Sequence, residues 1–199
     1  MIAIIDYGMG NLRSVKKAFD FLQVESFVTS DKEQLKLADK IVLPGVGAFE
    51  DAMKNLESYD LKKQIIKEIN NKKPFLGICL GLQMLFDFSQ EGNLPKGLSL
   101  LKGSVIKFDK NMNLKVPHMG WNNISVNKNM KYLSEFNNQY FYFVHSYFVK
   151  PEMDVKKAQT NYGIDFVSAI EHENILATQF HPEKSGKVGL KLLKKWARD

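Results

Sequence analysis

Short apolar runs alternate with segments of helical periodicity through the N-terminal half of the sequence, and this alternation limits the possible folds more than any other feature. The runs are nearly continuous in apolar residues, as strands buried on both faces are; they are Ile2 to Ile5, Val24 to Val28, Ile41 to Leu43 and Phe75 to Cys79. Between them, apolar residues recur at helical spacing from Leu12 to Leu22 and from Leu61 to Ile69, which predicts amphipathic helices. The pattern predicts repeated βαβ units, and therefore a parallel sheet with helices on both faces.

The sequence changes character after Gly92, where β-branched and aromatic runs are separated by Asn, Gly and Pro. Strands are predicted at Val105 to Phe108, Tyr140 to Val149, Val155 to Thr160, Phe166 to Ile170 and Ile175 to Phe180. The last two flank a hairpin loop, Glu171 to Asn174, and Lys187 to Trp196 has the pattern of a closing helix. The fold class that we predict is α/β, with a mixed, mostly parallel central sheet flanked by helices.

Composition limits the class of protein further. The chain has 199 residues, of which 44% are hydrophobic, so one core and a single domain over residues 1–199 are expected. No apolar run approaches the roughly 18 residues of a membrane helix, and the start Met1 to Asp6 lacks a signal-peptide pattern, so we expect a cytoplasmic protein without membrane contact.

A single cysteine excludes an intrachain disulfide and a cysteine zinc cluster, and no metal site is predicted. The formal net charge of +6 suits a phosphorylated ligand or an acidic partner surface, but it is weak evidence for nucleic acid.

The single cysteine lies between two glycines, in Gly77-Ile-Cys-Leu-Gly81, where a buried strand is expected to pass into a helix that begins near Leu80. This spacing is typical of a nucleophile elbow, a sharp strand-to-helix turn that needs residues without side chains on both sides. A helix N-terminus favours a thiolate, and the N–H of Leu80 would point to the place where an oxyanion forms. Cys79 is therefore a candidate nucleophile.

A base for this thiol is found in Gln179-Phe-His-Pro-Glu183. His181 and Glu183 are two positions apart, and in an extended segment such residues point to the same side, so the carboxylate would orient the imidazole. The histidine and Cys79 are far apart in sequence, and they meet only if the strands before them end at one edge of the sheet. Each motif also has a purely structural interpretation, with Cys79 as a small core residue and His-Pro-Glu as a strand-ending turn.

Together, Leu76-Gly-Ile-Cys-Leu-Gly-Leu-Gln83 and Gln179-Phe-His-Pro-Glu183 resemble the class I glutamine amidotransferases, which use a Cys-His-Glu triad and a flavodoxin-like fold. Further blocks, spread over nearly the whole chain, are similar to the glutaminase subunits of imidazole glycerol phosphate synthases. These blocks are Ile5-Asp-Tyr-Gly-Met-Gly-Asn-Leu-Arg-Ser14, Leu43-Pro-Gly-Val-Gly-Ala-Phe49, Val116-Pro-His-Met-Gly-Trp-Asn122, Phe143-Val-His-Ser-Tyr147 and His181-Pro-Glu-Lys-Ser185.

The resemblance implies a role for each matching position. Cys79 would be the nucleophile, His181 the general base and acid, and Glu183 the orienting carboxylate. The oxyanion hole would be formed by the backbone of Val46, Gly47 and Leu80, with a peptide flip in the loop from Pro44 to Gly47. The implied residues for binding substrate glutamine are Gly45, Gln83, His145, Ser146 and Tyr147.

The resemblance also implies a partner. In that family a (β/α)8 barrel cyclase forms a heterodimer with the glutaminase and consumes its ammonia in histidine biosynthesis. Glutamine is the implied substrate, with no cofactor and no nucleic acid. Residues in the matching blocks that would contact the partner are Asn11, His118, Trp121, Asn122, Tyr142 and Lys184.

Alternatives remain at this stage. Paralogous glutaminase subunits supply ammonia for acetamidino groups on surface-glycan sugars, and the active-site residues do not separate the two. A non-catalytic, nucleotide-binding flavodoxin-like module is a different class, but after Gly8-Met-Gly10 the third glycine of a dinucleotide fingerprint is replaced by Arg13. The aromatic run Tyr140 to Phe143 suggests an RNA-stacking face, although Lys150 is the only basic residue from Tyr140 to Lys150.

Overall fold

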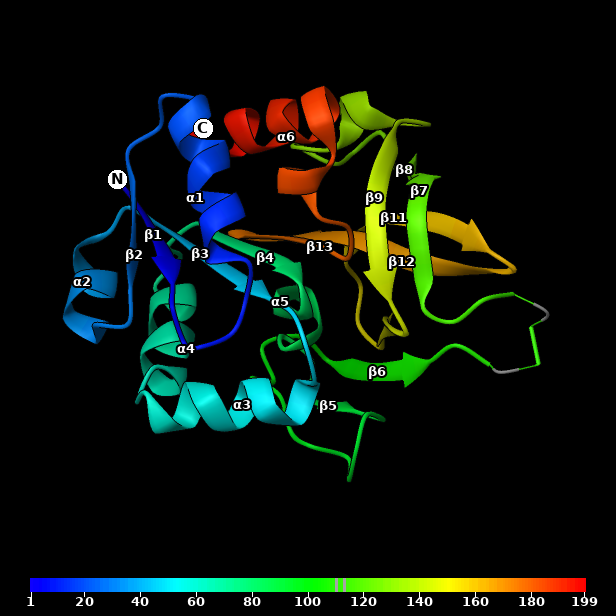
Figure 1. Ribbon diagram of the computed structural model, residues 1–199, viewed down its shortest axis with the longest axis horizontal. Coiled ribbons are helices and arrows are strands. Elements are labelled where there is room, and N and C mark those ends of the chain that lie inside the picture. The colour runs from blue at the N-terminus through cyan, green and yellow to red at the C-terminus, as the bar shows by residue number, and fades with distance from the viewer. Residues whose placement is uncertain (110, 113) are drawn as a thin grey trace.

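Residues 1–109, 111–112 and 114–199 are described by the structure, a computed structural model. A large mixed sheet lies at the centre, and a two-stranded sheet, β7 with β9, packs against it (Figure 1). The helices are α1 (Leu12–Phe21), α2 (Lys32–Leu37), α3 (Phe49–Ser58), α4 (Lys62–Asn70), α5 (Leu80–Gln83) and α6 (Gly186–Arg198), with 3-10 turns η1 (Ser134–Phe136) and η2 (Pro182–Lys184). The strands are β1 (Ile2–Ile5), β2 (Ser26–Thr29), β3 (Lys40–Gly45), β4 (Phe75–Cys79), β5 (Phe88–Ser89), β6 (Gly103–Lys107), β7 (His118–Asn123), β8 (Ser125–Val126), β9 (Tyr140–His145), β10 (Tyr147–Pro151), β11 (Lys156–Tyr162), β12 (Ile164–His172) and β13 (Ile175–Thr178).

The sheet joins a parallel half to an antiparallel half. Its order is β2-β1-β3-β4-β13-β12-β10-β6-β5, with β11 and β8 attached through β12. The five strands from β2 to β13 in this order run parallel, and β13 is the point of change, because it pairs in parallel with β4 and antiparallel with β12. The predicted α/β class, with a mixed sheet flanked by helices, is confirmed.

Alternate residues of β1 enter two separate cores, as expected of a strand covered on both sides. Ile2 and Ile4 pack with residues of α1 and α6, whereas Ala3 and Ile5 belong to the core that α2, α3 and α4 cover. In Figure 1 the first pair of helices lies on one side of the sheet and the second group on the other.

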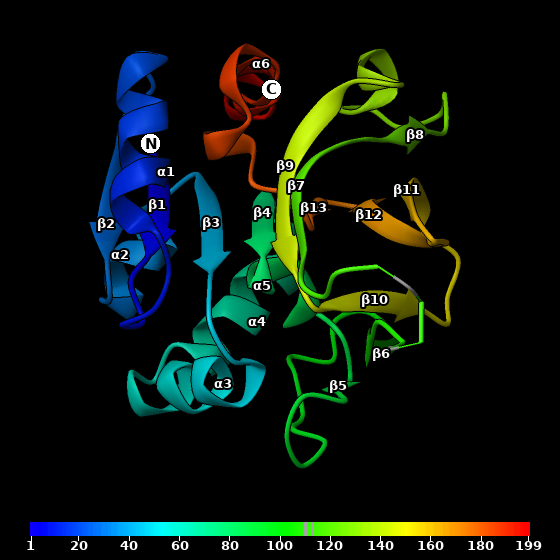
Figure 2. The ribbon, with the colours of Figure 1, turned by 45° about the vertical axis from the view of Figure 1, so that its right-hand side comes forward.

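The carboxyl ends of three neighbouring strands meet at one edge. Gly45, the last residue of β3, is paired with Cys79, the last residue of β4, and Thr178 at the end of β13 is paired with Ile78. Figure 2 shows β3 and β4 ending on the same side, with α5 directly after β4. This adjacency brings residues 79 and 179–181 together although they are far apart in the sequence.

Several predicted boundaries are wrong. The expected strand Tyr140 to Val149 is two strands, because the chain turns at Ser146 and β9 and β10 enter different sheets. The expected loop Glu171 to Asn174 is tighter: His172 pairs with Ile175, so the turn consists of Glu173 and Asn174 alone. Helices α2 and α3 and strands β5, β7 and β8 were not predicted.

Among the described residues, 1–109, 111–112 and 114–199, no helix combines the length and the apolar character needed to cross a membrane.

Candidate active site

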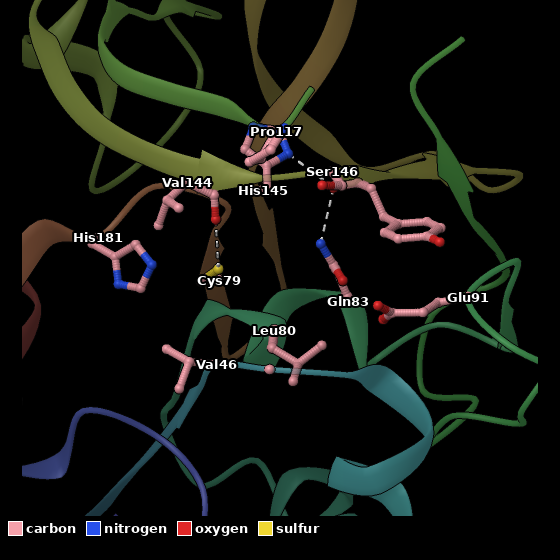
Figure 3. Close-up of a pocket in the computed structure, with 12 residues that line it drawn as sticks. Val46, Cys79, Leu80, Gln83, Glu91, Pro117, Val144, His145, Ser146 and His181 are labelled. Carbon is pink, nitrogen blue, oxygen red and sulfur yellow. Dashed lines mark hydrogen bonds between the residues drawn. The ribbon is translucent and has the colours of Figure 1, made fainter. Parts of the chain in front are cut away.

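A pocket opens at the carboxyl edge of the sheet, and it contains both Cys79 and His181 (Figure 3). In Figure 3 the sulfur lies between Val144 on one side and Leu80 on the other, with His181 at one end of the site and Glu91 at the opposite end. The residues that line the pocket are Val46, Gly47, Cys79, Leu80, Gln83, Glu91, Pro117, Val144, His145, Ser146, Tyr147 and His181.

The backbone at Cys79 has the strained turn that the Gly-x-Cys-x-Gly spacing predicts. Cys79 has φ 56° and ψ −105°, a conformation that costs free energy for a residue with a side chain. A Cβ on Gly81 would lie 2.0 Å from the Leu43 carbonyl oxygen, and one on Gly77 would lie 2.8 Å from the Gly81 oxygen. Both positions therefore require glycine. The expected helix is short, since α5 spans Leu80–Gln83 only, and its dipole gives correspondingly less support to a thiolate than a full helix would.

Glu183 contacts the imidazole of His181, but not for the reason that the sequence suggested. His181 is extended, with φ −100° and ψ 96°, whereas residues 182–184 form the 3-10 turn η2 rather than a continued extended segment. This turn folds the carboxylate back, and His181 Nδ1 lies 2.8 Å from Glu183 Oε1. Both side chains are buried.

Opposing electrostatic effects act on His181. Burial lowers the pKa of the ring, but the nearby Cys79 sulfur, the hydrogen bond to Glu183 and the negative charges of both outweigh it and raise this pKa to about 10. The ring is thus an imidazolium when it faces a thiolate. Within the described part of the chain, Nε2 has no hydrogen-bond partner of good geometry, which leaves it available to Cys79 and to a bound substrate.

Strand β9 holds the segment that carries His181. The N–H of His181 donates to the Tyr142 carbonyl at 2.9 Å, and the Tyr142 N–H donates to Ser185 Oγ at 3.0 Å. Ser185 Oγ in turn donates to the His181 carbonyl at 2.6 Å. Both ends of the turn that presents the imidazole are therefore bonded to one residue of the two-stranded sheet.

The loop after β3 lies beside the thiol, as the proposed oxyanion hole requires. Val46 and Gly47 line the pocket with Leu80, whose N–H, the first of α5, has no intrahelical acceptor. Gly45 does not fit its expected contact with substrate, because it is buried beneath the pocket. A Cβ there would approach Tyr7 Oη to 2.7 Å and Leu80 Cβ to 2.8 Å, so its glycine is needed for packing.

The other expected glutamine-binding residues lie together, on the side of Cys79 away from His181 (Figure 3). Gln83 Nε2 donates to the Tyr147 carbonyl at 3.0 Å, and His145 Nδ1 donates to the same oxygen at 2.8 Å. Ser146 lies between these residues in the pocket wall. The Tyr147 carbonyl oxygen therefore links α5 to the turn between β9 and β10 through hydrogen bonds.

Two further residues at the site were not predicted. Glu91 lines the pocket, and its Oε2 accepts from the Phe49 N–H at the start of α3 at 2.8 Å. Gln179 is fully buried and donates from Nε2 to Cys79 Sγ at 3.6 Å. A carboxylate in a region without periodicity gives no sequence signal, whereas Gln179 lies in the His-Pro-Glu block that was already singled out.

The expected partner residues are divided between surface and core. Trp121 is 56% exposed and lies opposite Tyr142 in the β7–β9 pair, and Lys184 is exposed beside Glu183. Asn11 caps α1 by accepting from the Ser14 N–H. His118 is only 3% exposed and contacts His145, with Nδ1 to Nε2 at 3.0 Å, so direct contact with a partner does not agree with its position. Asn122 is half-buried, and its Nδ2 lies 3.3 Å from His118 Nε2.

Comparison with known proteins identifies the family. The family model described as Glutamine amidotransferase class-I matches residues 3–198. The chain is 51% identical over 194 residues to the imidazole glycerol phosphate synthase subunit HisH of Methanothermobacter thermautotrophicus, an alignment that covers 98% of this chain and 96% of the relative. The chain is a class I glutamine amidotransferase. It is also 46% identical over 203 residues to the subunit HisH 1 of Campylobacter jejuni strain 81-176, with 100% of both chains covered.

Solved structures support the fold of this amidotransferase. One glutamine amidotransferase structure has a TM-score of 0.78 at 18% identity, with 100% of both chains covered. The glutaminase domain of Trypanosoma brucei CTPS has a TM-score of 0.67 at 21% identity, with 100% of this chain and 94% of that chain covered. At these identities the likeness concerns the fold alone. Membership of the family makes the protein an enzyme of glutamine hydrolysis.

Proposed function

We propose that this amidotransferase is the glutaminase subunit of an imidazole glycerol phosphate synthase, and that it releases ammonia from glutamine for a cyclase subunit. The observation that carries the proposal is the 51% identity to a HisH subunit over 98% of the chain. The pocket supports it, because the single thiol of the chain lies beside an imidazole that a carboxylate orients. As a biosynthetic subunit it would act in the cytoplasm, as one domain.

The proposed reaction uses the triad in two steps. The Cys79 thiolate attacks the amide carbon of glutamine, His181 Nε2 gives a proton to the nitrogen, and the C–N bond breaks to release ammonia. Water then attacks the thioester while His181 takes its proton, and glutamate leaves as the thiolate forms again. Glu183 keeps Nδ1 bonded throughout, so Nε2 is the nitrogen that exchanges protons.

Backbone donors would stabilise the oxyanion. Val46 and Leu80 lie on the side of the pocket opposite Val144 (Figure 3), and Gly47 also lines the pocket, so we assign the donors to the N–H of Leu80 and to one N–H of Val46 or Gly47. Such donors are most effective where water is excluded and the donors are already oriented. Tyr7 Oη donates to the Pro44 carbonyl at 3.0 Å, which fixes the start of the loop and confines any flip to the peptides after it.

The far end of the pocket suits the amino-acid part of the substrate. Glutamine has an α-ammonium group, and Glu91 presents a carboxylate to the pocket at the end opposite His181 (Figure 3). Only one of its oxygens accepts from Phe49, so the other can accept from an ammonium. We assign Gln83, Ser146 and Tyr147 to the substrate contacts between these ends.

The exposed face of the β7–β9 sheet is our candidate for the contact with a (β/α)8 barrel cyclase. Met119, Trp121 and Tyr140 are 62%, 56% and 58% exposed on this face, an apolar and aromatic surface of the kind that anchors interfaces. Direct contact with a partner has a chemical advantage, because ammonia released into neutral water becomes ammonium, which is not a nucleophile.

The proposal is tested with the purified full-length chain and the cyclase subunit that partners the Methanothermobacter relative. The mixture should convert glutamine to glutamate and form imidazole glycerol phosphate, and Cys79→Ala should abolish glutamine-dependent turnover while turnover supported by added ammonium salt continues. Glutamine hydrolysis that survives Cys79→Ala would contradict the triad. Turnover only with a glycan-modifying barrel subunit would favour the paralogous function.

A further inference from the structure

The side-chain amide of Gln179 is buried directly beside the nucleophile. Gln179 is 0% exposed, it follows β13, and its backbone N–H donates to the Ser168 carbonyl at 2.8 Å. Its Nε2 lies 3.6 Å from Cys79 Sγ, and its Oε1 accepts from Gln83 Nε2 at 3.0 Å. Because β13 is paired with β4 up to Thr178 and Ile78, the backbone places this side chain level with Cys79.

One carbonyl group determines the direction of this hydrogen-bond chain. The oxygen of Tyr147 can only accept, so the Gln83 group 3.0 Å from it must be the NH2. The second hydrogen of that NH2 then points to Gln179, which must present its oxygen there. The NH2 group of Gln179 is consequently turned toward the sulfur, so Cys79 Sγ receives a hydrogen-bond donor rather than an acceptor.

The sulfur needs such a donor. The carbonyl oxygen of Val144 lies 3.9 Å from Sγ, where it can accept from a thiol but repels a thiolate. Helix α5 has four residues, and its dipole gives limited support. His181 loses a proton to the departing ammonia, so it cannot be the constant partner of the sulfur.

We infer that Gln179 is a catalytic residue that donates a hydrogen bond to the Cys79 sulfur, stabilises the thiolate and holds it in place while His181 exchanges protons. The inference rests on the proposed glutaminase function. It assigns a second role to Gln83, which positions Gln179 in addition to its expected contact with substrate.

The test is the rate at which iodoacetamide alkylates Cys79 in the full-length chain, measured against pH. Gln179→Met removes the donor at similar volume, and Gln179→Glu replaces it with an acceptor of the same shape. A hydrogen bond to a charged group is strong enough to predict about a tenfold slower alkylation at pH 7 in Gln179→Met, and a larger decrease in Gln179→Glu. The midpoint of the pH–rate profile should move upward by about one pH unit.

Controls separate this effect from a loss of structure and from the proposed function. Gln159→Met, at an exposed position on β11, should leave the profile unchanged. Thermal unfolding shows whether each variant is folded. In Gln179→Met and Gln179→Glu, the kcat for glutamine should fall by a larger factor than KM rises. Unchanged alkylation profiles in folded Gln179→Met or Gln179→Glu would overturn the inference. Shifted profiles in a chain that does not hydrolyse glutamine even in the presence of the cyclase subunit would instead overturn the proposed function and leave the hydrogen bond in place.

Discussion

The buried pair His118 and His145 should make the folded state sensitive to mild acid. Burial lowers the pKa of His145 to about 3 and that of His118 to about 4. His145 Nδ1 donates to the Tyr147 carbonyl, so its Nε2 accepts from His118 Nδ1 at 3.0 Å. Each ring is therefore held neutral, with a defined tautomer.

The sign and the size of the effect follow from these values. Between the unfolded value near 6.5 and the folded values, the unfolded chain binds more protons than the folded chain, so stability falls as pH falls. From pH 7 to pH 5 the loss is about 2 kcal/mol for each histidine, or about 4 kcal/mol for the pair. His181 acts in the opposite direction, because its folded pKa is raised to about 10. Its protonation adds about 1 kcal/mol to the free energy of unfolding between pH 7 and pH 5.

Urea unfolding followed by tryptophan fluorescence at pH 7 and pH 5 measures this difference. His118→Asn keeps an amide donor for His145 and removes one titrating ring, so it should reduce the acid-linked loss by about 2 kcal/mol. Phe166→Leu is the matched control, because Phe166 packs against both histidines, at ring distances of 5.7 Å and 5.0 Å, without titrating. It should lower stability equally at both pH values. An equal acid-linked loss in the wild type and in His118→Asn would refute the reasoning.

Three further predictions concern the oxyanion loop, the elbow and the surface. Val46→Pro removes a backbone N–H and should lower kcat about a hundredfold or more, whereas Val46→Ala should not; steady-state kinetics that show no difference would exclude this donor. Gly81→Ala places a Cβ 2.0 Å from the Leu43 oxygen and should destabilise the fold by about 2 kcal/mol or more in urea unfolding, and an unchanged midpoint would mean that the turn relaxes. Trp121→Ala should weaken binding of the cyclase subunit about tenfold or more in calorimetry, with Phe21→Ala, 75% exposed on α1, as the control that leaves affinity unchanged.

The elbow and the meeting of Cys79 with His181 could be predicted, because both depend on local or topological rules. Two glycines around a cysteine impose a tight turn, and neighbouring parallel strands end at one edge. The position of Glu183 was expected for the wrong reason, since a 3-10 turn and not an extended segment brings it to the imidazole. A proline after His181 was consistent with both conformations.

The place of Glu91 in the pocket and the strand β7 could not be predicted from sequence patterns. Glu91 follows a two-residue strand and reaches the pocket through a bond to the start of α3, so its place depends on tertiary contacts alone. Strand β7 contains Gly and Asn, and its large apolar residues Met119 and Trp121 lie on the exposed face, the reverse of the arrangement expected for a half-buried strand. Helix α3, in contrast, has a readable signal, because its buried residues recur at helical spacing, at Phe49, Ala52, Met53 and Leu56.

The two backbone bonds of Tyr142 have a consequence for when glutamine is consumed. The strand that they join to the imidazole turn also forms the exposed aromatic face, so under the proposed function a cyclase subunit docked there would press on the same backbone that sets the angle of the ring. Docking and the alignment of the acid–base group would then be mechanically linked. An isolated chain would hydrolyse glutamine slowly, and the cell would lose little nitrogen before the two subunits have assembled.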